Sequence, residues 1–360
     1  MLPAVILASL LVALATALPL SRNPHWLIRG LDFPRFQLAV LAALVLLAQW
    51  LLLDYSHAWA WGLSAAVLVC LCWQLSWILP YTRLWRKEVR AASSADADRC
   101  LSILTANVLT PNRQAHKLVA LVEQHQPDIL VTLESDQWWE DQLACLELTM
   151  PHTIKCPLDN LYGMHVYSRL PLDETYIDFL VEDDVPSMHT RVRLRSGDWV
   201  RAHFLHPAPP SPTENPESAE RDAELVVVAR SIADSDQPLI VTGDLNDVAW
   251  SRTTRLFRKI SGLLDPRVGR GMFNTFHARY PLLRWPLDHL FHSQHFTVAN
   301  IRRMPAIGSD HFPLYSRLVF SPLKGRAQNG LESDATDQAL ADALKDGQAV
   351  SRADVPTPGE

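Results

Sequence analysis

Acidic, amide and histidine side chains lie at the ends of short apolar segments in the second half of the 360-residue chain. Six of them stand directly beside such segments: Asn107, Glu134, Asp244, Asn246, Asp310 and His311. The end of a strand is a place where a rigid sheet holds polar groups beside solvent. Carboxylate and amide oxygens suit a hard divalent cation such as Mg²⁺, which keeps several waters and takes few carboxylates. The pattern therefore indicates a metal site, with Mn²⁺ as the alternative ion.

Each of these residues also has an ordinary interpretation when taken alone. Asn107 is a typical turn former, Glu134 a typical surface glutamate, and Asp244 a typical helix cap or Asx turn. His206, which precedes Pro207, is a typical loop histidine. The Ser-Asp-His triplet at 309–311 alone would be a typical turn. The ordered occurrence of these five features at strand ends, within one domain, favours a common site over unrelated surface features.

The elements that must position these residues are short strands with interspersed helices. Apolar runs predict strands at 101–106, 128–133, 164–168, 189–194, 200–205, 239–242, 289–291 and 312–318. Helical spacing predicts helices at 113–125, 220–233 and 251–260. Because strands and helices do not alternate strictly, the pattern favours an α/β fold in which two sheets form a sandwich flanked by helices.

The first 80 residues have a different composition. Three segments, 2–20, 36–53 and 57–80, carry almost no charge, and each is close to the ~20 residues that cross a bilayer. They predict an N-terminal bundle of three transmembrane helices. The first segment has an alternative interpretation as a signal peptide, since Ala-Thr-Ala at 15–17 is an acceptable cleavage site.

These features divide the chain into four parts. We expect a transmembrane region at 1–82, a basic and then polar linker at 83–100, a catalytic domain at 101–320 and a polar, disordered tail at 321–360. Basic residues occupy 21–35 and 81–90, whereas the short loop at 54–56 has none. The positive-inside rule then predicts a multi-pass protein of a bacterial-type inner or plasma membrane with a cytoplasmic catalytic domain. Removal of the first segment would upset this count and favour the outer side.

Charge and cysteine content exclude several classes of protein. After residue 90 the chain has 26 Lys and Arg but 36 Asp and Glu. This acidic balance argues against a protein that holds long nucleic acid by broad charge attraction. The five cysteines match no zinc-binding spacing and indicate no disulfide framework.

From residue 101 to 320 the sequence resembles the endonuclease/exonuclease/phosphatase superfamily of DNase I-like metal phosphoesterases. The resemblance depends on an ordered set of motifs: TANV (105–108), PDILVTLE (127–134), SRLPL (168–172), LHPAPP (205–210), VTGDLND (241–247), PLDHLF (286–291) and GSDHFP (308–313). Any one motif is weak, whereas the complete order is specific. The resemblance implies a two-sheet α/β sandwich of the DNase I-like type and Mg²⁺-dependent hydrolysis of a phosphate ester.

The resemblance also implies a role for each matching residue. Asn107 and Glu134 would bind the metal, and Asp310 would line the metal position. Asp244 would activate the attacking water, and Asn246 would hold that water or a phosphoryl oxygen. Asp288 would fix the tautomer of His311. His206 would contact the phosphoryl group or protonate the leaving oxygen, and His311 would stabilise the charged phosphoryl oxygens.

The substrate is not specified by these motifs. The apolar N-terminal region and the acidic balance favour a lipid-linked or small phosphate over DNA, with the membrane bilayer as a partner. Arg252, Arg255 and Arg258 are candidates for substrate binding, although a solvated helix face is the ordinary interpretation. A membrane-tethered nuclease and a catalytically silent binding module remain as alternative functions.

Overall fold

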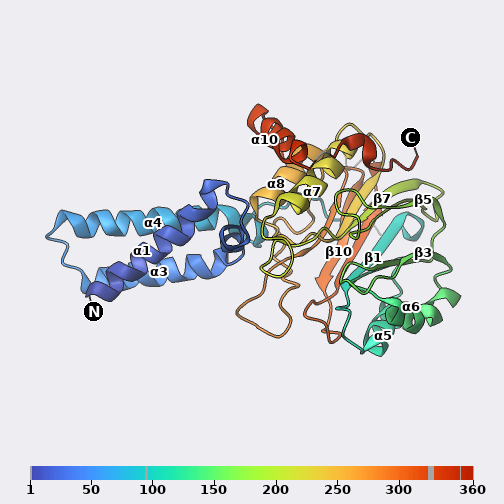
Figure 1. Cartoon of the computed structure of the whole chain (residues 1–360), viewed down its shortest axis with the longest axis horizontal. Coiled ribbons are helices and arrows are strands. Elements are labelled where there is room, and N and C mark those ends of the chain that lie inside the picture. Colours follow the sequence, from blue (N-terminus) through green and yellow to red (C-terminus); the bar gives the residue numbers. More distant parts are fainter. Residues whose placement is uncertain (1, 94–95, 323–327, 349, 360) are drawn as a thin grey trace.

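The computed structural model describes residues 2–93, 96–322, 328–348 and 350–359. It consists of a narrow stalk of three long helices and a larger head that contains the two sheets (Figure 1). The stalk, residues 2–81, contains α1 (Leu2–Ala17), α3 (Arg35–Leu52) and α4 (Ala58–Ile78). Each of the three predicted membrane segments falls in one of these helices, which with their flanking turns are long and apolar enough to cross a membrane.

Polar side chains within the stalk point towards its interior. The Gln49 amide donates to Ser9 Oγ at 2.9 Å, and the Gln74 amide donates to Thr16 Oγ1 at 3.0 Å. The outward faces instead expose leucine, valine and tryptophan. Hydrogen bonds between helices inside and apolar side chains outside are the arrangement expected of helices in an apolar solvent.

The head contains two sheets. The six-stranded sheet has the order β10-β11-β1-β2-β4-β3, and the five-stranded sheet has the order β5-β6-β7-β8-β9. The strands of the first are β1 (Cys100–Asn107), β2 (Ile129–Leu133), β3 (His152–Cys156), β4 (Met164–Ser168), β10 (Phe296–Arg303) and β11 (Leu314–Phe320). Those of the second are β5 (Leu172–Asp178), β6 (Ser187–Arg193), β7 (Trp199–Leu205), β8 (Leu239–Asp244) and β9 (Asp288–His292).

The two sheets pack face to face around the main apolar core. Ile103 of β1, Val131 of β2 and Ile240 of β8 are among its fully buried members. Thr105 and Thr242 form a hydrogen bond of 3.0 Å between the central strands β1 and β8. The predicted α/β sandwich is therefore confirmed.

Helices cover the outer faces of both sheets. On the six-stranded sheet lie α5 (Ala115–His125) and α6 (Gln137–Leu143), and on the five-stranded sheet lie α7 (Ala219–Ile232) and α8 (Arg252–Ser261). The central strands of each sheet are therefore covered on one face by the other sheet and on the opposite face by helices. This explains why the central strands are continuous apolar runs that the sequence reveals.

In the head, three strands and two helices were not predicted: β3, β5, β10, α6 and α10 (Ala335–Asp346). The sequence of β5 is LDETYID, and most of its side chains are exposed. It is an edge strand, so it lacks the apolar run that marks the central strands. Its pairing with β6 is set by tertiary contacts rather than by its own composition.

The expectation of a disordered tail at 321–360 is wrong for the described part of that segment. Helix α10 (Ala335–Asp346) begins with a capping box between Asp334 and Asp337. Ala341 of this helix and Val350 beyond it are buried in the apolar cluster that contains α7. Helix α10 is polar in composition because only a narrow face of it, around Ala341, packs on the head, while its other side chains contact solvent.

The segment between stalk and head is also more ordered than a free linker. Ala91 lies beside Val298 of β10, the Ala92 N–H donates to the Val298 carbonyl, and the Val89 side chain is fully buried. Part of the expected linker therefore pairs with β10, the edge strand of the six-stranded sheet.

The stalk and head are packed directly against each other. The Tyr81 hydroxyl donates to the Ala249 carbonyl at 2.6 Å, and the Trp250 indole donates to the Asp32 carbonyl at 3.0 Å. Ala39 and Ile78 of the stalk share an apolar cluster with Trp250. These contacts hold the head against the start of α3 and the end of α4.

Candidate active site

Five polar side chains at strand ends come together at one edge of the sandwich. Asn107 is the last residue of β1, and Glu134 directly follows the parallel strand β2. Asp244 ends β8, and its register partner Asp288 begins the antiparallel strand β9. His311 lies three residues before β11. The two sheets therefore deliver all five to the same edge.

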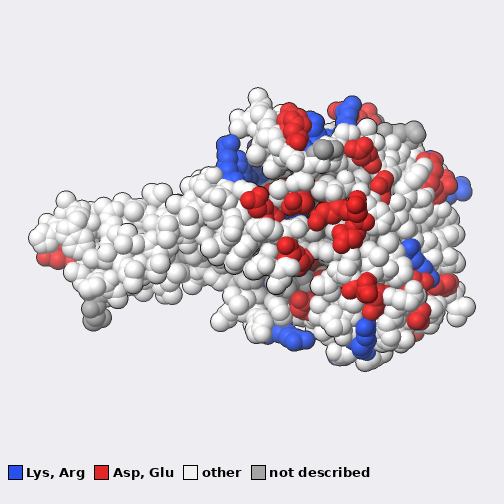
Figure 2. Space-filling model, in the orientation of Figure 1, with Lys and Arg blue, Asp and Glu red and all other residues white. Residues whose placement is uncertain are grey.

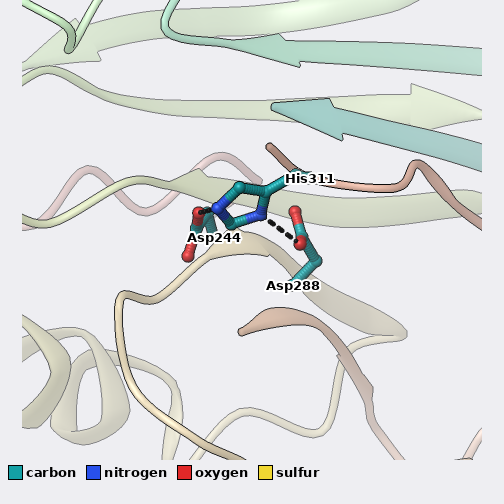
Figure 3. A group of neighbouring side chains, drawn as sticks. All are labelled: Asp244, Asp288 and His311. Atoms are coloured by element: carbon teal, nitrogen blue, oxygen red, sulfur yellow. Dashed lines mark hydrogen bonds and ion pairs between the residues drawn. The ribbon is translucent and has the colours of Figure 1, made fainter. Parts of the chain in front are cut away.

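Asp244, Asp288 and His311 form a compact buried triad (Figure 3). His311 Nδ1 lies 2.8 Å from Asp288 Oδ2, and His311 Nε2 lies 3.4 Å from Asp244 Oδ2. The imidazole is thus held between two carboxylates. Burial alone would lower the pKa of His311, but these two carboxylates outweigh it and raise that pKa to about 10. His311 is accordingly a cation at neutral pH.

Asn107 joins this triad to Glu134. Its amide nitrogen lies 2.6 Å from Glu134 Oε1 and 3.2 Å from Asp244 Oδ2. The other Glu134 oxygen, Oε2, is buried with no hydrogen-bond partner among the described residues, and so is Asp288 Oδ1. Burial raises the pKa of Glu134 to about 8, and burial likewise raises the pKa of Asp244. A carboxylate that is buried and lacks a partner is costly unless a cation compensates it.

Two more predicted residues adjoin the triad through the loops after β7 and β8. The Asn246 N–H donates to Asp244 Oδ1 at 2.9 Å, and its amide donates to the Pro207 carbonyl at 3.0 Å. His206, next to Pro207, is buried, and its Nδ1 has no partner in the described structure. Burial lowers the pKa of His206 to about 4, so that its ring is neutral at pH 7.

Gly243 allows these two loops to approach. Its φ is +152°, and a Cβ placed on it would lie 1.8 Å from the Leu205 carbonyl oxygen. A side chain would push β8 away from β7 at the point where His206 and Asp244 must meet. The glycine of the VTGDLND motif is therefore required by backbone contact.

Asp310 completes the predicted set at the margin of the site. Its side chain is half-buried and accepts a hydrogen bond from Ser309 Oγ at 3.2 Å. Its charge acts on both Glu134 and His311, raising the pKa of each. The structure thus gathers all eight residues predicted as catalytic or metal-binding.

The donor set of this site fits a hard divalent cation. Glu134 offers a free carboxylate oxygen, and Asn107 and Asp310 lie beside it. Oxygen donors of this type match Mg²⁺ or Mn²⁺ rather than a thiophilic metal. These three residues are the ones that would hold the ion.

The prediction for the three arginines of α8 requires correction. Arg258 is buried and forms an ion pair with Glu88 and a hydrogen bond to Tyr81 Oη. The Arg255 guanidinium lies over the Trp77 ring, 5.3 Å from its centre. Arg252 lines a cavity of about 280 Å³ together with Arg22 and Arg29. All three face the junction with the stalk, so their spacing reflects that contact and not substrate binding.

Other cations beside the site were not anticipated. Arg284 and Arg303 lie on Phe312, next to His311, with guanidinium-to-ring distances of 5.0 and 4.3 Å. The Phe276 ring packs against the His311 ring, with 4.9 Å between the ring centroids. For Phe276 and Arg284, the sequence contains only one indication of a place near the site, which is that residues 276–285 directly precede the motif that contains Asp288.

Comparisons with known proteins agree with this geometry. The family model described as "Endonuclease/Exonuclease/phosphatase family" matches residues 104–311. No curated protein matches the chain. Among solved structures, Danio rerio TDP2 complexed with single-strand DNA product has a TM-score of 0.53 at 18% identity, covering 61% of this chain and 99% of that one. The human Nocturnin catalytic domain with bound sulfate has a TM-score of 0.50 at 17% identity, covering 62% and 96%.

A third similar structure, an endonuclease/exonuclease/phosphatase from Beutenbergia cavernae, has a TM-score of 0.50 at 17% identity and covers 62% of this chain and 72% of that one. At these identities the solved structures establish a shared fold, while the family model spans more than half of the sequence and includes all eight gathered residues, with His311 at its end. The chain belongs to the endonuclease/exonuclease/phosphatase family.

Proposed function

We propose that the chain is a membrane-anchored, Mg²⁺-dependent phosphoesterase that hydrolyses a lipid-linked or small phosphate ester. The observation that supports this most is the buried Asp244–His311–Asp288 triad beside the unpartnered Glu134 oxygen. The triad lies in a head that is packed on three helices long and apolar enough to cross a membrane.

The residues of the chain divide the work of phosphoester hydrolysis. Glu134, Asn107 and Asp310 would hold the divalent cation, which would supply Lewis acidity to the phosphoryl oxygens. Asp244 accepts the proton of the attacking water, and Asn246 holds that water. Asp288 holds the His311 ring beside Asp244, so that a positive charge lies close to the phosphoryl group on which negative charge develops.

His206 complements this cationic histidine. Because its ring is neutral and its Nδ1 lacks a partner in the described chain, it is available to accept a proton, or to donate a hydrogen bond to the phosphoryl group or the leaving oxygen. Such positioned acid–base help contributes roughly 10²–10⁴-fold to a rate. Two histidines with opposite protonation states thus serve two different oxygens.

Surface charge supports a small or lipid-linked ester over a long nucleic acid. Figure 2 shows acidic side chains across the visible face of the head, with basic ones mainly at its margins. A polyanion is repelled by such a face, whereas a single phosphate group needs only the local cations of the site.

A substrate panel tests this function. The full chain in detergent or vesicles, supplied with Mg²⁺, should release phosphate or headgroup from phospholipid or prenyl-phosphate substrates. Asp244→Ala and His311→Ala should abolish release, and Glu123→Ala on the exposed side of α5 should not. Efficient cleavage of plasmid DNA with no activity on lipid or small esters would show a nuclease instead. A folded protein inactive on every phosphoester would show a silent module.

We further infer that the head is cytoplasmic. The basic residues of 21–35 and 81–90 all lie at the head end of the stalk, and the opposite end has none. Cys145 is an exposed native thiol on the head. A membrane-impermeant maleimide should label it in lysed but not in intact cells, with Cys145→Ser as the control. Equal labelling in intact cells would reverse the orientation.

A further inference from the structure

The segment 277–285, HARYPLLRW, forms a loop with an apolar tip. Leu282 is 83% exposed, Tyr280 56% and Leu283 48%. Three neighbouring large apolar side chains on the surface of a soluble head are unusual and mark a contact surface. In Figure 1 the loop, drawn in orange, lies on the side of the head that faces the stalk.

The tip lies beside the start of an apolar stalk helix. The Gln37 amide of α3 donates to the Leu282 carbonyl at 2.7 Å. The Phe33 ring packs edge-on against the Trp285 ring, with 5.6 Å between the ring centroids. From this point α3 exposes Phe36 and Val40 on its outer surface. The exposed tip therefore continues the apolar surface of the helix at the level where the helix leaves the head.

Basic residues flank the tip. Arg279 is exposed on one side, and on the other side the Arg284 guanidinium donates to the His277 and Ala278 carbonyls. An apolar tip between two arginines suits the boundary between acyl chains and anionic headgroups. A protein partner would not account for the continuity with α3, whereas a bilayer around the helix does.

The base of the same loop forms a wall of the active site. The Ala278 N–H donates to the Asp310 carbonyl at 2.6 Å, and the Phe276 ring contacts the His311 ring. The Phe276 N–H donates to the Trp285 carbonyl, which closes the loop at its base. Only a few residues separate the exposed tip from the catalytic histidine.

We propose that loop 277–285 inserts its tip into the bilayer interface beside α3 and so holds the site at the level of lipid headgroups, where the substrate is the phosphate ester of a membrane lipid. This inference rests on the proposed phosphoesterase function and narrows its substrate class. The cationic residues at the loop base would meet the headgroup phosphate as it leaves the membrane plane.

Fluorescence quenching tests the insertion without any need for activity. The full chain, with its accessible Cys72, Cys145 and Cys156 replaced by serine, carries a single labelled cysteine at position 282 or at position 148, whose native leucine is 91% exposed elsewhere on the head. In vesicles that contain phosphatidylglycerol and a lipid with a quencher near the headgroup, the probe at 282 should be quenched and the probe at 148 should not. Absence of quenching at 282, or equal quenching at both positions, would overturn the insertion.

Kinetics test the consequence for substrate. Leu282→Ser with Leu283→Ser should lower hydrolysis of a phospholipid in vesicles by about tenfold or more, because two apolar side chains no longer enter the interface. Hydrolysis of a water-soluble phosphate monoester should stay within about twofold, and Leu148→Ser should change neither rate. Equal loss on both substrates, or no loss on vesicles, would contradict the proposal. If the wild-type chain hydrolyses no ester at all, the proposed function fails, while the quenching result still decides the insertion.

Discussion

At the scale of single residues, the site depends on carboxylates that the protein buries without neutralising them fully. His311 compensates Asp244 and Asp288, but Glu134 has only the Asn107 amide and keeps one oxygen unpartnered in the described structure. This imbalance is a cost in stability that a bound cation removes. A metal requirement is therefore expected from the burial of Glu134 as much as from its chemistry.

Metal binding should therefore stabilise the folded chain. Saturating Mg²⁺ should raise the melting temperature of the chelator-treated protein by about 3 °C or more, because a ligand at 100 times its Kd adds about 2.7 kcal/mol. Glu134→Gln should lose this rise, and Glu123→Gln should keep it. The measurement is thermal unfolding in detergent with EDTA or Mg²⁺. An unchanged rise in Glu134→Gln would show that the ion binds elsewhere.

We expect Asp288 to be a positioning residue that acts through the His311 ring, which it contacts. Asp288→Asn should lower kcat by about a hundredfold or more with little change in KM, because the amide no longer holds the imidazolium in place. Steady-state kinetics on a soluble phosphate ester measure both constants. A loss confined to KM would instead place Asp288 in substrate binding.

The sequence predicted the central residues of the site because each follows or begins a strand whose position the apolar pattern reveals. Asp244 and Glu134 needed only their own strands to be placed. Arg258 was misassigned because helical spacing gives the face of a helix but not its partner, which here is Glu88 in the segment between stalk and head. Contacts of that kind depend on tertiary packing.

At the scale of elements, α7 contains an unusual buried acid. Glu224 lies on this helix with its Oε1 unpartnered within the described chain, and burial, assisted by Glu182, raises its pKa to about 8. The neighbouring helix α10 covers α7, although the sequence predicted no ordered element there. The apolar strands were predictable, whereas an edge strand such as β5 was not, since its exposed side chains carry no periodic signal.

The raised pKa of Glu224 makes stability depend on pH. The folded state binds its proton more tightly than the unfolded state does, so this contribution is complete below about pH 4.5 and is lost as the pH rises towards 8. The melting temperature should fall between pH 5 and pH 9, and Glu224→Gln should reduce that fall. Glu123→Gln, on an exposed helix face, should follow the wild-type curve. Identical pH curves for Glu224→Gln and wild type would contradict the burial of this carboxyl group.

At the scale of the whole molecule, the contact between stalk and head makes the two parts interdependent. Trp250 is 2% exposed and bonds to Asp32, and Val248 and Leu287 share its apolar cluster with Ala39 and Ile78. No local pattern predicts this interface, because its partners are separated by more than 160 residues. It orients the active site relative to the helices and places loop 277–285 beside α3.

Because the two parts depend on each other, removal of the stalk and substitution of Trp250 should have non-additive effects on the stability of the head. Removal of residues 1–81 should lower the melting temperature of the head, because the apolar cluster around Trp250 becomes exposed. Trp250→Ala should cost the full chain about 3–5 kcal/mol. The same substitution in the truncated head should cost much less, since Trp250 has already lost its partners there. Thermal unfolding of the four proteins measures the coupling. If the two changes add, the stalk and head are independent bodies, and the position of the active site at the membrane surface is not fixed by this interface.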